Sequence, residues 1–582
     1  MSKQITVKHE RIDDIPVIIA QLKKMRVDKL IDTHFPTNGN WTGLSLGGVV
    51  VVWLTFIISE GDHRLYRVEP WVAEHKRTLR RCLGKKVEPR DCTDDRLATV
   101  LDYVSVTEPW VEFECALNQS VIRVYDLQKR MARVDSTTVA AFVTPEGMFQ
   151  LGHSKDHRSD LPQLKIALSV LDPLGLPLTT TVVAGNTADD PLYLPEIAKV
   201  RKIVEITGLS YVGDCKMAAI GTRAEIVAHG DFYLCPLSAK QMPEAELDLV
   251  LEPVFAGVQP LAEVRLAHAD EHADDTADPV AVGFEYTVAQ SGQDQSGQRQ
   301  HWQERRLVVR SLAFAASQEK SLRMRVARAV TEINALDERK QGKKCLPDEA
   351  AARAAAEALL AKHRVAGLVQ VDVTTETHEH VKRRYGARPA LTVRSARRRV
   401  HAASDAAAVE HAVRRLGWRV YATNHTAENL SLAQGVAAYR SEYLIEEGFG
   451  RLKGRSLSLA PLFLHYEHRI VGLICLLTIA LRVLVLMQYV VRRNLVHQGA
   501  TLKGIYPGQF GRQTTRPTTE MMLRTFRGLT LSQVTINGQT FDHVTPLNDV
   551  QQRILELLEF PMAIFSKIAT QFSNTDFHSR EM

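Results

Sequence analysis

Residues 133–139 read RVDSTTV, a β-branched run that carries a single acid, Asp135. The pattern continues with LKIALSVL (164–171), a DPLG turn (172–175), LTTTVV (178–183) and a helix-like segment (192–204). The short apolar run LSYVGD at 209–214 then ends in a second acid, Asp214. Since β-branched runs bounded by turn residues favour strands, this order predicts three strands, a helix and a fourth strand in an α/β fold.

Acids on the first and fourth strands of such a unit match the ribonuclease-H-like fold, a mixed sheet flanked by helices. In that fold the first and fourth strands are neighbours, so we expect Asp135 and Asp214 to lie close together. A third acid arriving on a helix, Glu446, would complete a site for two metal ions.

The candidate helix for this third acid is YRSEYLIEEGFGRLK at 439–453. Tyr439, Glu446 and Lys453 are seven residues apart, which places them in one stripe on one helix face. A carboxylate between an aromatic hydroxyl and an ammonium suits work on a phosphodiester. The alternative is the solvated face of an ordinary surface helix.

Carboxylates are the ligands that this chemistry requires. Mg²⁺ prefers oxygen ligands and keeps several waters, and Mn²⁺ can substitute for it. A pair of such ions activates an attacking oxygen and stabilises the leaving one during in-line displacement. Repulsion among the acids would raise their pKa values until metal binds.

Taken together, the chain resembles bacterial insertion-sequence transposases of the DDE class. It is similar to the branch that has a Tyr–Arg–Glu–Lys signature and a β-rich insertion before the catalytic Glu. The matching segments are VDST (134–137), GHSKDHR (152–158), GNTAD (185–189), VGD (212–214), residues 439–453 and HYEHRI (465–470). The resemblance implies Mg²⁺-dependent cleavage of the element's ends and joining to target DNA, with Asp135, Asp214 and Glu446 as catalytic and metal-binding residues.

One position departs from the signature, because Glu442 stands where the family has its arginine. Arg440 or Arg451 could supply the missing cation. Glu447 is a rival for the third ligand, but the register favours Glu446.

The resemblance also implies the partners, which are double-stranded DNA (terminal inverted repeats and target) and a second copy of the chain in a homodimer. The predicted DNA contacts are Tyr439, Lys453, Arg440, Arg451, Trp418, His157 and Arg158. Trp418 could stack on a flipped base, as an insertion-domain Trp does in related transposases; the alternative is a core Trp on a sheet.

The chain divides into five predicted segments. They are a helical DNA-end-binding and assembly domain (1–121), the first part of the ribonuclease-H-like core (122–231), a β-rich insertion domain with a helical hairpin (232–432), the second part of the core with the catalytic Glu helix (433–491), and a C-terminal tail for dimerisation or DNA contact (492–582). The insertion is inferred because the spacing between Asp214 and Glu446 is far too long for a loop.

Composition adds weaker constraints. The 582 residues carry a net charge of +6, which alone does not imply DNA binding, but basic clusters at 76–90 and 382–399 fit phosphate contacts. Seven cysteines without a CxxC pair, and no secretory signal, favour a reduced, cytoplasmic, nucleoid-associated protein. The apolar run at 470–491 is long enough to span a membrane, yet a buried core helix is expected there.

Two functions other than DNA transposition are also compatible with the sequence. A metal-dependent nuclease would hydrolyse DNA without strand transfer. A decayed copy would bind the element's ends without cutting, and Glu442 in the arginine position favours that alternative.

Overall fold

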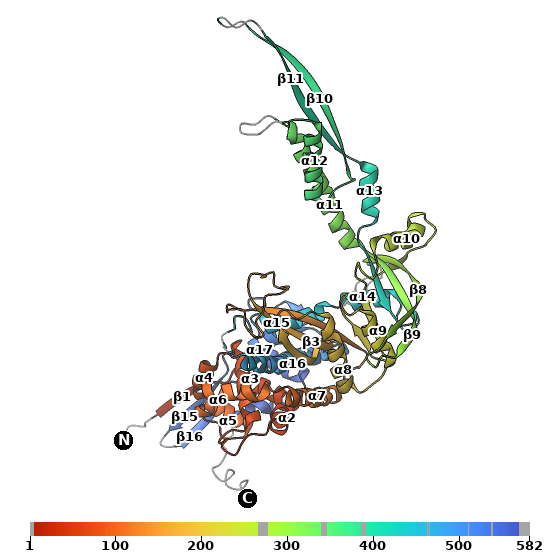
Figure 1. Ribbon diagram of the computed structural model, residues 1–582. Helices are drawn as coiled ribbons and strands as arrows, with labels where there is room; N and C mark the ends of the chain where they lie inside the picture. Colours follow the sequence, from red (N-terminus) through yellow and green to blue (C-terminus); the bar gives the residue numbers. More distant parts are fainter. Residues whose placement is uncertain are drawn as a thin grey trace. The chain divides into compact units, whose positions relative to one another are not determined.

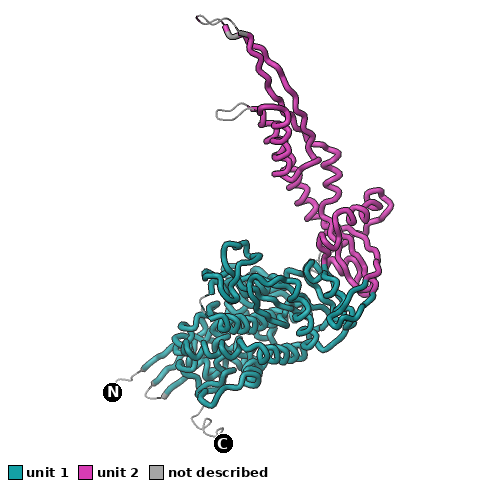
Figure 2. Tube along the Cα trace, viewed as in Figure 1, with its two compact units in different colours: residues 1–235, 291–301, 438–582 teal, residues 236–290, 302–437 magenta. Residues whose placement is uncertain are grey.

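The protein was analysed as a computed structural model that describes residues 5–265, 278–338, 346–383, 386, 391–462, 464, 466–509, 511–536 and 539–569. The chain divides into two compact units (Figure 2). The first unit comprises residues 1–235, 291–301 and 438–582, and the second comprises 236–290 and 302–437. Both units mix helices and strands (Figure 1), so the protein is of the mixed α/β class.

The first unit is built on a mixed sheet with the strand order β4-β3-β2-β5-β6. Its strands are β2 (Met131–Ala140), β3 (Gln163–Leu171), β4 (Leu176–Ala184), β5 (Ser210–Val212) and β6 (Phe232–Pro236). β3 runs antiparallel to both β2 and β4, whereas β5 runs parallel to β2 and β6. The four strands expected between 133 and 214 are therefore present, and the first and fourth are neighbours as predicted.

Helices cover this sheet and form the N-terminal region. They are α1 (Ile15–Lys24), α2 (Val27–His34), α3 (Leu46–Glu60), α4 (Val68–Glu74), α5 (Lys76–Leu83), α6 (Asp94–Val104), α7 (Thr107–Val124), α8 (Tyr193–Val204) and α9 (Ile220–Ala228). The helix expected at 192–204 is confirmed by α8.

The long apolar helix α16 (Glu467–His497) is the centre of the first unit, where it contacts β4, α3 and α6. In the part of the chain that the structure describes, α16 is long and apolar enough to cross a membrane, and α3 with residues 65–74 passes the same test only as a bent pair. However, 94% of the most apolar window of α16 is buried inside the protein. Its one central charge is also paired, because Arg482 Nη2 donates to Glu114 Oε1 on α7 at 2.6 Å.

The two ends of the chain meet in a small sheet of the first unit. A strand that the sequence did not reveal, β1 (Ile5–Arg11), pairs antiparallel with β15 (Thr530–Ile536), which pairs with β16 (Gln539–Val544). The other elements after α16 are β13 (Leu502–Lys503), β14 (Gln513–Thr514), α17 (Thr519–Arg524), α18 (Asp549–Leu557) and α19 (Ala563–Ala569). The described residues after α16, in the segment predicted as a C-terminal tail, belong to the same compact unit as the N-terminal helices.

The second unit holds most of the strands expected between 232 and 432. Its strands are β7 (Ala262–Val264), β8 (Ala281–Gln293), β9 (Arg299–Ser311), β12 (Trp418–Thr423) and the long hairpin β10 (Val369–Lys382) and β11 (Leu391–Ser404). Its helices are α10 (Glu244–Phe255), α11 (Leu312–Asn334), α12 (Glu349–His363) and α13 (Ala406–Arg414). The predicted helical pair is confirmed by α11 and α12, which pack through a buried apolar cluster against the hairpin.

The single helix predicted for 439–453 is wrong. α14 (Leu432–Arg440) ends before α15 (Tyr443–Lys453) begins, so Tyr439 does not share a helix with Glu446 and Lys453. The guanidinium of Arg133 donates to the carbonyl of Ala438, the group to which the amide of residue 442 would bond in a continuous helix. The Glu442 amide instead bonds to the Tyr439 carbonyl at 3.1 Å, which tightens the chain into a turn.

Candidate active site

Asp135 lies on β2, and Asp214 lies just after the end of β5, the parallel strand beside it. Arg133 on β2 pairs with Val212 on β5, and each acid follows two residues later. Both aspartates line one small cavity, to which the start of α15 contributes Glu442. The sheet therefore brings together two of the three acids expected from the sequence.

Asp135 is held by a lysine and a backbone amide. Lys155 Nζ lies 2.9 Å from Asp135 Oδ1, and the Ser136 amide donates to the same oxygen at 2.7 Å. Burial raises the pKa of Asp135; the Lys155 ammonium opposes this rise, and the nearby Asp214 carboxylate adds to it. The Lys155 ammonium therefore favours the ionised form of Asp135 and partly offsets the effect of burial on its pKa.

Asp214 is held by a tyrosine on α8. The Tyr193 hydroxyl donates to Asp214 Oδ1 at 2.6 Å, and the Lys216 amide donates to the same oxygen at 2.8 Å. The preceding Gly213 permits this close approach, because a Cβ atom there would lie 2.9 Å from the Tyr193 ring. Burial, followed by the charge of Asp214, raises the pKa of Tyr193 well above its usual value, so the hydroxyl stays protonated and acts as a donor.

The acids of α15 take different positions. Glu442, at the N-cap of the helix, is half-buried and lines the cavity with the two aspartates. Burial raises its pKa, and the charges of Asp135, Glu446 and Asp214 raise it further. Glu446, one turn later, is exposed. The residue in the signature's arginine position is thus the α15 acid that lines the cavity beside both aspartates.

The donor set has the chemistry of a magnesium site, because every candidate ligand is a carboxylate oxygen. Within the described residues, however, no three Asp, Glu, His or Cys side chains are grouped closely enough to hold a metal ion. The Asp135 carboxylate accepts a hydrogen bond from Lys155, and the Asp214 carboxylate accepts one from Tyr193. The chemical type of the ligands therefore fits Mg²⁺, while a complete ligand set is not assembled.

A second lysine lies along β2 near these acids. Lys453, at the end of α15, donates to Thr137 Oγ1 at 3.0 Å and to Asp156 Oδ1 at 2.6 Å. With Lys155, it places two ammonium groups at the part of β2 that follows Asp135.

The remaining predicted DNA contacts are scattered. Arg158 is exposed and pairs with Asp160 at 2.8 Å, while His157 is exposed with a left-handed φ of 57°. Arg440 is exposed at the end of α14. These side chains are accessible, but nothing in their geometry singles them out.

Arg451 and Trp418 are engaged within the protein. Arg451 is buried and its Nε lies 3.0 Å from Glu520 Oε1. Trp418, in the second unit, packs on an apolar cluster that includes Val308 and Val420, and its Nε1 donates to the Arg414 carbonyl at 3.0 Å. This is the setting of the core-Trp alternative.

Sequence reasoning missed Lys155 and Tyr193 as site residues. Lys155 belongs to the segment GHSKDHR (152–158), which is one of the segments that resemble the transposase family. The sequence therefore contained a signal for this residue. Tyr193 begins α8 and carried no signal, since only the packing of α8 brings its hydroxyl to Asp214.

Comparisons with known proteins give a coarse result. Residues 7–111 match DUF4277, a domain of unknown function that is found in transposases. No curated protein matches the chain. The cryo-EM structure of a piggyBac transposase synaptic complex with hairpin DNA matches at 9% identity and a TM-score of 0.23; the match covers 50% of this chain and 62% of that one, less than two thirds of its length. At that TM-score the likeness carries no argument, so the DUF4277 match alone points to a DNA transposase in general.

Proposed function

We propose that the protein is a DNA transposase of the DDE class that cleaves the ends of a bacterial insertion sequence and joins them to target DNA. The observation that carries the proposal is the placement of Asp135 on β2 and of Asp214 two residues after the neighbouring parallel strand β5, where both line one cavity with Glu442, the N-cap of α15. Paired acids at a shared strand edge are what two-metal phosphodiester chemistry requires.

The strand order supports a ribonuclease-H-like core within this proposal. Three antiparallel strands, a helix and two further parallel strands occur in chain order β2, β3, β4, α8, β5 and β6. Residues 236–290 and 302–437 form a separate compact unit, and the chain returns to the first unit at residue 438, within α14 and before α15. That interruption is consistent with an insertion domain between the second aspartate and the catalytic glutamate.

In this proposal Asp135, Asp214 and Glu446 hold Mg²⁺, which when bound would activate the attacking oxygen and stabilise the leaving one. Tyr193 orients Asp214, and Lys155 keeps Asp135 ionised. Lys453 contacts the DNA backbone near the cut. A homodimer in the DNA complex and a nucleoid-associated location in the cytoplasm complete the proposal.

The test combines purified protein with linear DNA that carries the element's own ends, in Mg²⁺ or in EDTA. We expect metal-dependent nicking at the element boundary, lost in Asp135→Asn and in Asp214→Asn while end binding persists. Asp160→Asn is the matched control, because Asp160 is exposed and pairs only with the exposed Arg158 among the side chains described. Near-normal cleavage by Asp135→Asn would show that the site is assigned wrongly.

A separate experiment decides whether Glu442 or Glu446 is the third acid of the site. The family signature assigns Glu446, whereas Glu442 is the acid that lines the cavity. Glu442→Gln and Glu446→Gln should be assayed side by side for nicking and for Mn²⁺ binding by electron paramagnetic resonance. Loss of both activities in only one variant identifies the ligand.

A joining assay separates the two alternative functions. Only a transposase inserts the cleaved 3′ end into a target plasmid; a nuclease yields cut ends alone. End binding without any cleavage would identify a decayed copy and make Glu442→Arg the next variant to build.

A further inference from the structure

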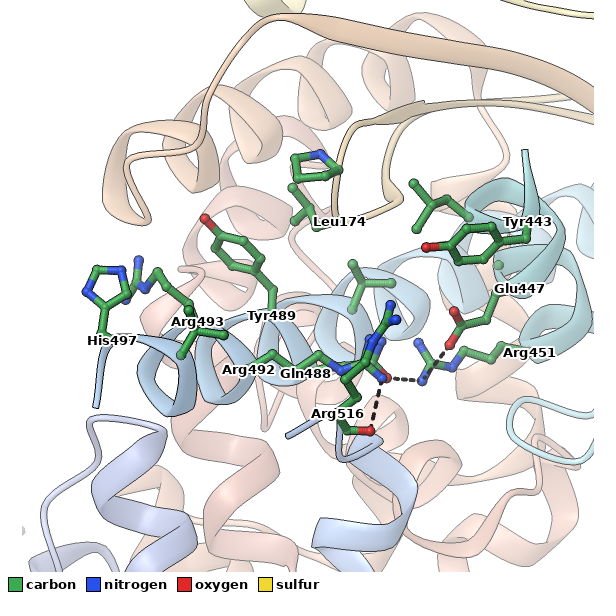
Figure 3. A pocket seen from close by; sticks show the side chains of 15 residues that line it. Leu174, Tyr443, Glu447, Arg451, Gln488, Tyr489, Arg492, Arg493, His497 and Arg516 are labelled. Carbon is green, nitrogen blue, oxygen red and sulfur yellow. Dashed lines mark hydrogen bonds and ion pairs between the residues drawn. The ribbon is translucent and has the colours of Figure 1, made fainter. Parts of the chain in front are cut away.

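A second cavity in the first unit, of about 330 Å³, lies between α15, α16 and the turn after β3 (Figure 3). Its lining includes one exposed tyrosine, Tyr443, a second tyrosine, Tyr489, and four arginines. The arginines are Arg451, Arg492, Arg493 and Arg516, and Glu447 is the carboxylate among the lining residues. The cavity therefore has a strong excess of positive charge.

Two of the arginines are neutralised by partners in the protein. Arg451 pairs with Glu520 at 3.0 Å and with Glu447 at 3.4 Å. Arg493 pairs with Glu559 at 2.9 Å. The charges of Arg451 and Arg493 are therefore balanced by carboxylates within the protein.

The other two arginines lack a carboxylate partner among the described residues. Arg492 donates only to backbone carbonyls, from Nε to Pro517 at 3.1 Å and from Nη2 to Arg516 at 3.5 Å. The exposed Arg516 guanidinium makes no ion pair there. Burial, and then the charges of Arg516 and Arg451, lower the pKa of Arg492 against the opposing charge of Glu447. Two neighbouring cations that form no ion pair with a carboxylate are stabilised when an anion binds between them.

The aromatic side chains in the lining indicate which kind of anion the cavity would bind. Tyr443 is 47% exposed, and in Figure 3 its ring lies above Glu447 and Arg451 in the same cavity. Guanidinium groups recognise phosphate oxygens, and an aromatic ring beside them accepts the face of a base. The cavity volume is at the lower end of the range for sites that enclose a small organic group.

The cavity is also linked to the candidate active site through one helix. Tyr443, Glu447 and Arg451 are four residues apart and form the stripe of α15 that lines this cavity. Glu442 and Glu446 lie on the neighbouring stripe of the same helix. A DNA strand held in the cavity would therefore contact the helix that carries the third acid.

We propose that this cavity binds a phosphodiester of the DNA substrate, with Arg492 and Arg516 on the phosphate oxygens and Tyr443 against the adjoining nucleotide. This inference rests on the proposed function, because it names a contact with the same substrate. It assigns a DNA-binding role to residues outside the signature.

The experiment measures the affinity of the full chain for element-end duplex in Ca²⁺ across a series of salt concentrations. Since each neutralised phosphate contributes about one unit to the slope of log affinity against log salt, and both guanidinium groups contact one phosphate, Arg492→Gln with Arg516→Gln should weaken binding and reduce the slope by about 1. Arg492→Lys with Arg516→Lys should keep most of the slope. Arg553→Gln is the control, since Arg553 pairs with Glu556 outside the cavity and should leave binding unchanged.

The outcomes separate this inference from the proposed function. If the wild type cleaves end DNA and the double Gln variant keeps its salt slope, the cavity is not a DNA site although the transposase proposal stands. If the wild type neither binds nor cleaves end DNA, both are overturned. Should the double variant unfold, the exposed single variant Arg516→Gln decides: unchanged affinity and slope reject the site, and weaker binding with a smaller slope supports it.

Discussion

The Lys155 ammonium lies 2.9 Å from Oδ1 of Asp135, so an amino group from the segment after β2 neutralises the acid at the candidate site. Asp135 is mostly buried, with 21% of its side chain exposed, and Asp214 lies close enough to raise its pKa. A divalent cation bound at Asp135 would have to compete with this ammonium. If Asp135 binds a divalent cation as proposed, Lys155 would couple the stability of the protein to metal binding.

Replacing Lys155 by Met should destabilise the metal-free protein by about 1–3 kcal/mol, because a buried acceptor loses its charged donor. Mg²⁺ should then raise the melting temperature of Lys155→Met more than that of the wild type, since the ion meets no competing ammonium. Differential scanning calorimetry with and without Mg²⁺ measures this. Lys362→Met, which removes an exposed partner of Glu332, is the control. Equal Mg²⁺ shifts in the wild type and Lys155→Met would contradict the coupling.

Removing one hydroxyl from α8 tests the orientation of Asp214. Tyr193→Phe deletes the donor to Oδ1 and leaves the ring packing intact. Loss of such an orienting bond typically costs about 10–100-fold in metal affinity or activity, and we expect a cleavage rate lowered by that amount with unchanged DNA affinity. Tyr66→Phe, at a tyrosine that is 60% exposed, should have no effect. A normal rate in Tyr193→Phe would remove this residue from the site.

The buried pair between Glu114 and Arg482 should dominate the stability of the first unit. Arg482 is fully buried on α16, so Arg482→Met leaves an unpaired carboxylate in the core and should cost about 3–5 kcal/mol of unfolding free energy. Adding Glu114→Gln should recover much of that loss, because the uncompensated charge is then gone. Urea unfolding of the two single variants and the double variant measures the coupling. Additive losses would show that the pair does not act as a unit.

Asp14 should make stability depend on pH. It is buried at the N-cap of α1, where burial raises its pKa to about 6 against the opposing hydrogen bond from Ser59. Because the folded-state pKa is higher than the unfolded value of 3.8, this group's contribution is complete below pH 4 and is lost as the pH rises through 6. The stability of Asp14→Asn minus that of the wild type should therefore increase by about 3 kcal/mol from pH 4 to pH 7. A difference that does not change with pH would contradict the raised pKa.

Local patterns in the sequence were sufficient to predict the elements around the site. The β-branched run at 133–139 and the apolar runs at 164–171 and 178–183 became β2, β3 and β4, because side-chain alternation and turn residues act over a few positions. The neighbouring positions of Asp135 and Asp214 followed from strand order. The helices α11 and α12 could be predicted for the same reason, because helical patterns also depend on residues that are close in sequence.

The helix at 439–453 was predicted wrongly and the strand β1 was missed because both depend on contacts between distant parts of the chain. The expected helix at 439–453 is interrupted because Arg133, some 300 residues earlier, donates to the Ala438 carbonyl. Helical periodicity contains no information about such a partner. The pairing of β1 with β15 was missed likewise, since Ile5 and Ile536 meet only after the chain has folded.

The sequence by itself therefore determined the strands and the helix around the two aspartates, the order of the acids and the resemblance from which the transposase proposal began. Tertiary structure alone decided that Lys155 and Tyr193 hold the two aspartates, and that Glu442 lines their cavity while Glu446 is exposed. It also decided that Arg492 and Arg516 line a second cavity and form no ion pair among the described residues. The physical reason is range: helix and strand formation depend on neighbours along the chain, whereas the charge, burial and partners of a site depend on packing between segments that are far apart in it.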